Sequence, residues 1–129
     1  MKKIKTGILI SGRGSNMAAL IKATREHDYP AEIVLVISNK ADAPGLGIAR
    51  REGIKTSVVM QSAFATKAEF EAELQKNLLD AGVELICLAG FMRVLSADFV
   101  NLWQGRLINI HPSLLPAYRG LHTHERALA

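Results

Sequence analysis

The chain has 129 residues, of which 49% are hydrophobic and 22% are charged. Because a domain averages roughly 150 residues, this length predicts one domain, residues 1–129, and excludes a multidomain protein. The hydrophobic content excludes a disordered chain, and the charge-free stretches fall far short of the roughly 20 apolar residues of a membrane helix. We therefore expect a folded domain with no membrane partner.

Charge and cysteine content narrow the class of protein. The 16 basic and 12 acidic side chains give a net charge of +4. However, there is no run of five like charges and only 5% of residues are aromatic, which favours a small anionic ligand over a nucleic acid. Cys87 is the only cysteine, so no internal disulfide can form, and the apolar run near the N-terminus is too short for a signal peptide. We expect a cytoplasmic protein.

Strand and helix patterns alternate along the chain. The first strand leads through a Gly-rich turn, residues 11–14, into a helix with apolar positions at i, i+3, i+4 and i+7. A capping box at Thr66 and Glu69 begins a later helix, and Gly82 ends it. The predicted strands are residues 4–10, 31–38, 54–60, 83–89 and 106–110, and two further predicted helices are residues 44–51 and 96–103.

This alternation predicts the fold class α/β, with an open, doubly wound and mostly parallel sheet of the Rossmann-like kind. Residues 83–89 are apolar on both faces, so we expect this strand at the centre of the sheet. The last residues, 123–129, allow about two helical turns and include no capping glycine. We therefore expect the domain to be incomplete at its C-terminus.

The turn after the first strand is a candidate anion site. Parallel sheets bind ligands beyond the carboxyl ends of their strands, where Gly14, Ser15 and Asn16 begin a helix. Backbone N–H groups, the helix dipole and two polar side chains suit a phosphate. A dinucleotide site is disfavoured because Met17 replaces its third glycine and no acidic residue ends the second strand. The alternative interpretation of this turn is that it only joins the strand to the helix and binds nothing.

Asn109 and His111 lie two residues apart at the end of the last predicted strand. They should face the same side of the sheet, and Pro112 then turns the chain away. An amide can donate a hydrogen bond to a developing oxyanion, and an imidazole can carry a proton at neutral pH. The pair therefore suits carbonyl chemistry, unless it serves only to secure the end of the strand.

Three other features have less chemical meaning. The apolar loop of residues 91–95 suits either a pocket for a flat heterocycle or a segment tucked into the core. Cys87 lies within an apolar strand, so we expect it to be a core residue rather than a nucleophile. His122 and His124 have no third metal ligand at helical spacing, so we predict no catalytic metal.

Four segments, in chain order, are ILISGRGSN, VISNKADAPGLGIA, LAGFMRVLS and INIHPSLLPAYRGLHTHERAL. Together they resemble the phosphoribosylglycinamide formyltransferases, folate-dependent enzymes of purine biosynthesis, in register from about residue 8 to residue 128. The resemblance implies the formyltransferase fold and formyl transfer from 10-formyltetrahydrofolate to the amine of glycinamide ribonucleotide, without a metal. The implied partners are these small molecules, and a homo-oligomer is left open.

The resemblance also implies roles for individual residues. Gly14, Ser15 and Asn16 match the positions that bind the substrate phosphate, and Asn109 and His111 match the catalytic pair. The positions that bind folate correspond to Lys67, Met92, Arg93, Val94, Leu95 and Asn109.

This sequence departs from the family pattern at Lys67, where the family often has an arginine with a planar fork that lysine lacks. The family also uses an Asp beyond the end of this chain to keep the imidazole protonated. A cis bond between Leu115 and Pro116 is implied as well. The alternative functions are a formyltetrahydrofolate hydrolase, another folate formyltransferase such as the tRNA enzyme, and a non-catalytic module that binds a nucleotide or folate.

Overall fold

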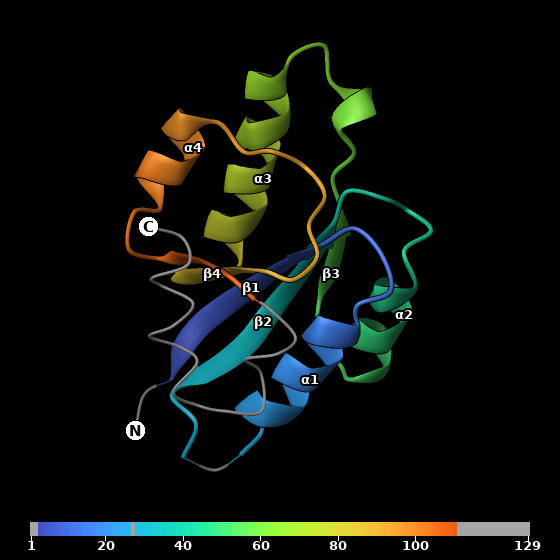
Figure 1. The fold of residues 1–129 in the computed structure, drawn as a ribbon, viewed down its shortest axis with the longest axis vertical. Helices are drawn as coiled ribbons and strands as arrows, with labels where there is room; N and C mark the ends of the chain where they lie inside the picture. Colours follow the sequence, from blue (N-terminus) through green and yellow to red (C-terminus); the bar gives the residue numbers. More distant parts are fainter. Residues whose placement is uncertain (1–2, 27, 111–129) are drawn as a thin grey trace.

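A computed structural model describes residues 3–26 and 28–110 of the chain. Within these residues five strands form one sheet in the order β3-β2-β1-β4-β5, and every neighbouring pair is parallel (Figure 1). The α/β fold class is therefore confirmed. The strands are β1 (Ile4–Ile10), β2 (Ala31–Ser38), β3 (Thr56–Val58), β4 (Leu85–Leu88) and β5 (Leu107–Asn109).

The helices of the described residues cover both faces of this sheet (Figure 1). One face packs against α1 (Ser15–Thr24) and α2 (Pro44–Arg51), and the other packs against α3 (Lys67–Asp80) and α4 (Ala97–Leu102). A short 3-10 helix, η1 (Gln61–Ala63), precedes α3. The sheet is thus doubly wound, as predicted. No helix in this part of the chain has the length and apolar character needed to cross a membrane.

The side chains of β1 belong to two separate cores. Ile8 and Ile10 pack on the same side as Met17 of α1, whereas Leu9 packs on the other side with Phe70 of α3. The three strand side chains are fully buried, each with 0% exposure. Burial on both faces explains why this strand is a continuous apolar run rather than an alternating one.

Several elements match the sequence patterns closely. β1, β2 and α2 have the predicted bounds, and the buried residues of α1 are the four that the apolar periodicity selected. The capping box of α3 is confirmed, because Thr66 Oγ1 accepts from the Glu69 N–H and Glu69 Oε1 accepts from the Thr66 N–H, each at 3.1 Å. Gly82, with a φ of 73°, follows the end of this helix.

Other expectations about strands were wrong in detail. β3, β4 and β5 are shorter than predicted, and the strand at the centre of the sheet is β1 rather than β4. The N–H groups of Ile54 and Val83 donate to Ala49 O and Leu78 O, both at 3.0 Å. Ile54 and Val83 therefore close the preceding helices instead of joining the sheet.

The sheet has a topological switch point between β1 and β4. The chain adds β2 and β3 on one side of β1 and then crosses to add β4 and β5 on the other side. The connections that follow β1 and β4 consequently lead to helices on opposite faces, which opens a crevice at the carboxyl edge of the sheet. The loops of residues 11–14 and 89–96 both begin at this edge.

Candidate functional site

The loop after β1 presents the N-terminus of a helix without a side-chain cap. Gly14 is the N-cap of α1, with a φ of 77°, a left-handed conformation that glycine adopts without strain. No side chain caps α1, and its first turn contains no acidic residue. Ser15 is exposed and Asn16 is half-buried at the same place. N–H groups at the positive end of a helix dipole bind anions, so this geometry suits a phosphate.

A second helix N-terminus lies against this loop. The N–H of Gly45, near the start of α2, donates to the carbonyl oxygen of Gly12 at 3.2 Å. α2 also lacks a side-chain cap and has no acidic residue in its first turn. The positive ends of two helix dipoles therefore meet at the loop after β1, which strengthens its preference for negative charge.

A buried polar pair connects the ends of β1 and β2 to the loop after β4. Ser11 is 3% exposed and Asn39 is 6% exposed. Ser11 Oγ accepts from the Met92 N–H at 2.7 Å. The Asn39 amide, oriented by its partners, donates to Ser11 Oγ at 2.5 Å and to Ile10 O at 3.3 Å, and it accepts from Arg93 Nε at 3.2 Å. Three strand ends are thereby joined by side-chain hydrogen bonds.

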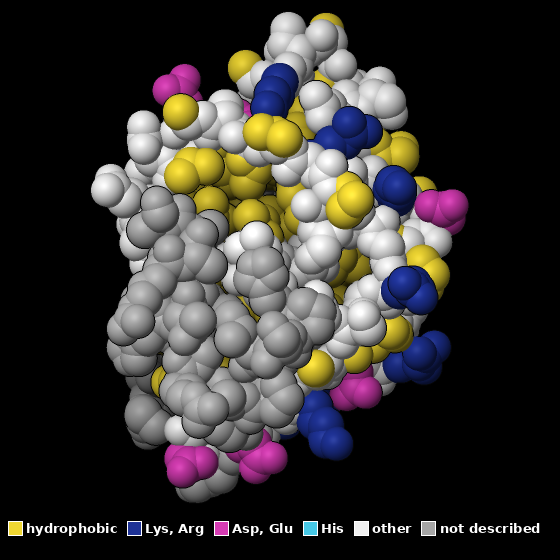
Figure 2. Space-filling model, viewed as in Figure 1, with side chains coloured by type: hydrophobic (Ala, Val, Ile, Leu, Met, Phe, Trp, Pro, Cys, Tyr) yellow, Lys and Arg dark blue, Asp and Glu magenta, His cyan; other side chains and the backbone are white. Residues whose placement is uncertain are grey.

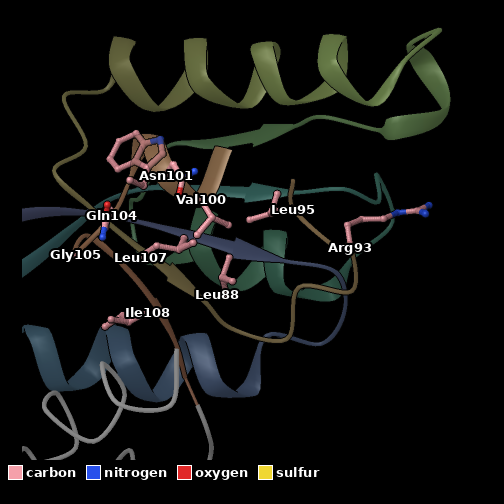
Figure 3. A pocket seen from close by; sticks show the side chains of 10 residues that line it. Leu88, Arg93, Leu95, Val100, Asn101, Gln104, Gly105, Leu107 and Ile108 are labelled. Atoms are coloured by element: carbon pink, nitrogen blue, oxygen red, sulfur yellow. The ribbon is translucent and has the colours of Figure 1, made fainter. Parts of the chain in front are cut away.

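An apolar cavity of about 710 Å³ lies beside β4, β5 and α4. This volume lies within the range of about 300–1,000 Å³ that is usual for small-molecule sites. Figure 2 shows apolar side chains gathered in a hollow between α4 and the loop after β4. In Figure 3 the Arg93 side chain points away from the apolar residues of the cavity. The lining includes Leu88, Arg93, Leu95, Val100, Leu107 and Ile108.

The loop between β4 and α4 is anchored at both ends and exposed between them. Met92 and Val94 are 74% and 79% exposed. At the far end, Ser96 donates from its N–H to Glu71 Oε2 at 2.7 Å and from Oγ to Glu71 Oε1 at 2.5 Å. Glu71 is only 8% exposed, so this carboxylate is a buried anchor for the N-cap residue of α4.

Asn109 stands at the same edge of the sheet. It is the last residue of β5, is half-buried, and lies opposite Leu88 of β4 in the sheet register. Because side chains alternate along a strand, Asn109 faces the same side as Leu107, which lines the cavity. Asn109 is adjacent to the cavity-lining strand residues Leu107 and Ile108 but is not itself among the residues that line the cavity.

The structure does not bring Lys67 into this cavity. Lys67 begins α3 and lines a different hollow, of about 430 Å³, together with residues at the start of α4 such as Ser96 and Phe99. The match of Lys67 to a folate-binding position stays a prediction. In the structure Lys67 lies beside the start of α4, whereas Arg93 and Leu95 line the larger cavity.

Several sequence predictions lie outside the described residues. They concern the catalytic role of His111, the cis bond between Leu115 and Pro116, and the pair His122 and His124. Among residues 3–26 and 28–110, no group of three or more His, Cys, Asp or Glu side chains could hold a metal ion.

Cys87 is a core residue, as predicted. Its side chain is 3% exposed and packs in the cluster that includes Ile8 and Ile108. Burial raises the pKa of the Cys87 thiol to about 12. Because the thiolate is the reactive form, this residue is chemically inert at neutral pH.

The sequence patterns did not reveal the buried partners Ser11, Asn39 and Glu71. A signal was present for the first two: each follows an apolar strand, in the segments ILIS and VISN, and the two strands were predicted to be parallel. Polar residues at the carboxyl ends of adjacent parallel strands come close together. Glu71 had no such signal, because its partner is 25 residues away in a loop.

These features define a parallel α/β protein with an uncapped helix N-terminus after β1 and an apolar cavity beside β4, β5 and α4. A sequence model of the formyl transferase family matches residues 4–129. The chain belongs to the formyl transferase family.

Individual relatives agree with this assignment. The phosphoribosylglycinamide formyltransferase of Escherichia coli K12 is 48% identical over 121 residues, which are 94% of this chain and 57% of that protein. The trifunctional purine biosynthetic protein adenosine-3 of Drosophila melanogaster is 54% identical over 98% of this chain and 10% of its own length. A crystal structure of the Brucella melitensis phosphoribosylglycinamide formyltransferase is 50% identical, with a TM-score of 0.83 over 98% of this chain and 66% of that one. The chain thus spans part of each relative.

Proposed function

We propose that this chain supplies the substrate-binding edge of a phosphoribosylglycinamide formyltransferase, which transfers a formyl group from 10-formyltetrahydrofolate to the amine of glycinamide ribonucleotide. The observation that carries the proposal is the presence of two complementary features after β1 and β4, the two strands that flank the switch point. An uncapped helix N-terminus at Gly14 suits a phosphate, and a cavity of about 710 Å³ suits a flat heterocycle. The names of the relatives above support the same reaction.

The phosphate of the ribonucleotide is assigned to the loop after β1. Gly14, Ser15 and Asn16 would offer backbone N–H groups and two polar side chains to the phosphate oxygens. The folate is assigned to the loop after β4, residues 92–95. The Met92 N–H already donates to Ser11, so the free backbone groups for the heterocycle would come from the following residues.

Asn109 and His111 are assigned to the reacting carbonyl. The substrate amine attacks the formyl carbon, and the negative charge that develops on the formyl oxygen would be held by the Asn109 amide and by a protonated His111. The C–N bond to the folate then breaks, the folate nitrogen takes up a proton, and the amine loses one. This route needs neither a metal nor a covalent bond to the protein.

A folate hydrolase is the second candidate. Formyltetrahydrofolate deformylase of Burkholderia mallei is 28% identical to this chain, with a TM-score of 0.74 over 84% of it. In a hydrolase water would replace the ribonucleotide amine, and the phosphate loop would have no substrate to bind. The helix N-terminus at Gly14 therefore favours the transferase. The proposed partners remain small molecules in the cytoplasm, with no nucleic acid.

The experiment measures where the formyl group goes. The chain is joined to the remaining C-terminal residues of the E. coli relative and incubated with 10-formyltetrahydrofolate labelled in the formyl group. We expect label in formylated glycinamide ribonucleotide, and at least a 10²-fold lower rate for His111→Ala, because a proton carrier at the reacting carbonyl is lost. Labelled formate released at the same rate with and without the ribonucleotide would identify a hydrolase instead.

A further inference from the structure

We propose that Ser11 and Asn39 are positioning residues that fix the folate-binding loop relative to the phosphate-binding loop. This inference rests on the proposed function. Ser11 directly follows β1, immediately before Gly12, and its Oγ accepts from the Met92 N–H at 2.7 Å. Asn39 follows β2 and accepts from Arg93 Nε at 3.2 Å. The pair therefore contacts the backbone of Met92 and the side chain of Arg93 in the loop after β4.

Because Ser11 and Asn39 are buried, the loss of either hydrogen bond should cost free energy that water does not restore. Ser11 and Asn39 are 3% and 6% exposed, so water cannot readily replace a lost partner. Before this point the loop is held by the Ala89 N–H, which donates to Leu9 O at 3.0 Å, and by Phe91, which packs against the core. Met92 and Val94, in contrast, are 74% and 79% exposed. Removing the Ser11 hydroxyl would leave the Met92 N–H without its acceptor and would loosen the exposed middle of the loop.

The neighbouring residue Ser38 shows that closing the end of β2 does not require Asn39. Ser38 is 0% exposed, donates from Oγ to Lys40 O at 2.7 Å, and accepts from the Lys40 N–H at 3.0 Å. These bonds complete the turn after β2 within itself. The Asn39 amide instead reaches across to Ser11 and Arg93. Ser38 is therefore a matched control: a buried polar residue at the same strand end without contact to the loop after β4.

The first test measures ligand binding by the 129-residue chain with tetrahydrofolate and with glycinamide ribonucleotide as separate probes. We expect Ser11→Ala and Asn39→Ala to weaken tetrahydrofolate binding by roughly tenfold, as for the loss of a buried hydrogen bond. Ribonucleotide affinity should change less than about twofold, because the N–H groups of α1 remain in place. Ser11→Thr, which keeps a hydroxyl, should restore folate binding, and Ser38→Ala should leave both affinities unchanged.

The second test is independent of any ligand. Amide hydrogen exchange of Met92 should accelerate at least tenfold in Ser11→Ala and not in Ser38→Ala, because only the first variant removes its acceptor. Unchanged folate affinity together with unchanged exchange in Ser11→Ala would overturn the positioning role. Equal weakening of both ligands would also overturn it, since the pair would then be merely structural. Failure of the chain completed with the C-terminal residues of the E. coli relative to bind tetrahydrofolate would instead overturn the proposed function, together with this inference.

Discussion

A β-carbon built on Gly14 would lie 2.8 Å from the Cα atom of Gly45. Real Cβ atoms essentially never come this close to backbone, and Gly14 also has a left-handed φ of 77°. The loop after β1 and the start of α2 are thus packed without room for any side chain at this point. The glycine is required by the shape of the loop itself, independently of any ligand.

The first prediction concerns Gly14→Ala. The clash and the unfavourable φ should lower the free energy of unfolding by about 1–3 kcal/mol. Because the loop must also shift, the affinity for glycinamide ribonucleotide should fall, whereas tetrahydrofolate binding should persist. Thermal unfolding and calorimetric titration with the two ligands check these expectations.

Gly12→Ala is the matched control for that prediction. A β-carbon on Gly12 meets no atom within 4 Å, and Gly12 has no positive φ. This variant should unfold at nearly the same temperature as the unmodified chain. Equal destabilisation by both substitutions would show that the contact between Gly14 and Gly45 is not the cause.

The second prediction concerns Asn109. In the chain completed with the C-terminal residues of the E. coli relative, Asn109→Ala should lower the rate of formyl transfer by about 10²-fold or more, the usual effect of losing an oxyanion donor. Asn109→Asp should be equally damaging, because it keeps the shape of the side chain but loses the amide donor. A rate within a fewfold of normal for either variant would remove Asn109 from the reaction.

The third prediction concerns the capping box of α3. Thr66→Ala removes the oxygen that accepts from the Glu69 N–H, which should cost about 1 kcal/mol of stability. Ser62→Ala alters an exposed serine just upstream and should leave the melting temperature unchanged. A melting temperature for Thr66→Ala equal to that of Ser62→Ala would contradict the assigned cap.

The fourth prediction concerns pH dependence. Burial raises the pKa of Cys87 from 9.0 to about 12, so between these values the unfolded chain loses a proton that the folded chain keeps. Stability from this residue is therefore fully present below pH 9.0 and declines as the pH rises towards 12, by about 1.4 kcal/mol per pH unit. The free energy of unfolding, measured with denaturant at several pH values in this range, should fall more steeply with pH for the unmodified chain than for Cys87→Ala. Parallel curves would disprove the effect.

The sequence predicted the elements whose signals are local. The helix α1 followed from the spacing of Met17, Leu20 and Ile21, and the start of α3 followed from Thr66 and Glu69. The ends of β3 and β4 could not be predicted in this way. The hydrogen bonds of Ile54 and Val83 to the preceding helices depend on how each connection folds back, which apolar patterning does not determine.

The candidate site could be predicted only in part for the same reason. The turn at Gly14 and the strand end at Asn109 were visible because each is a short motif at a strand end. The pairing of Ser11 with Met92 spans 81 residues, and the contact of Glu71 with Ser96 depends on the packing of α3 against α4. Such contacts follow from tertiary structure, and no spacing within a single segment reveals them.

The strand order also predicts that the turn at Gly14 and the apolar cavity form at different stages of folding. The turn at Gly14 lies inside the β1-α1-β2 unit, whose strands are close in sequence, whereas the cavity forms only after β4 has paired with β1 across most of the chain. Loop closure over such a distance is slower and entropically more costly. During refolding, the anion site should therefore be assembled while the cavity is still absent, and folate binding, unlike phosphate binding, reports that the whole sheet has formed.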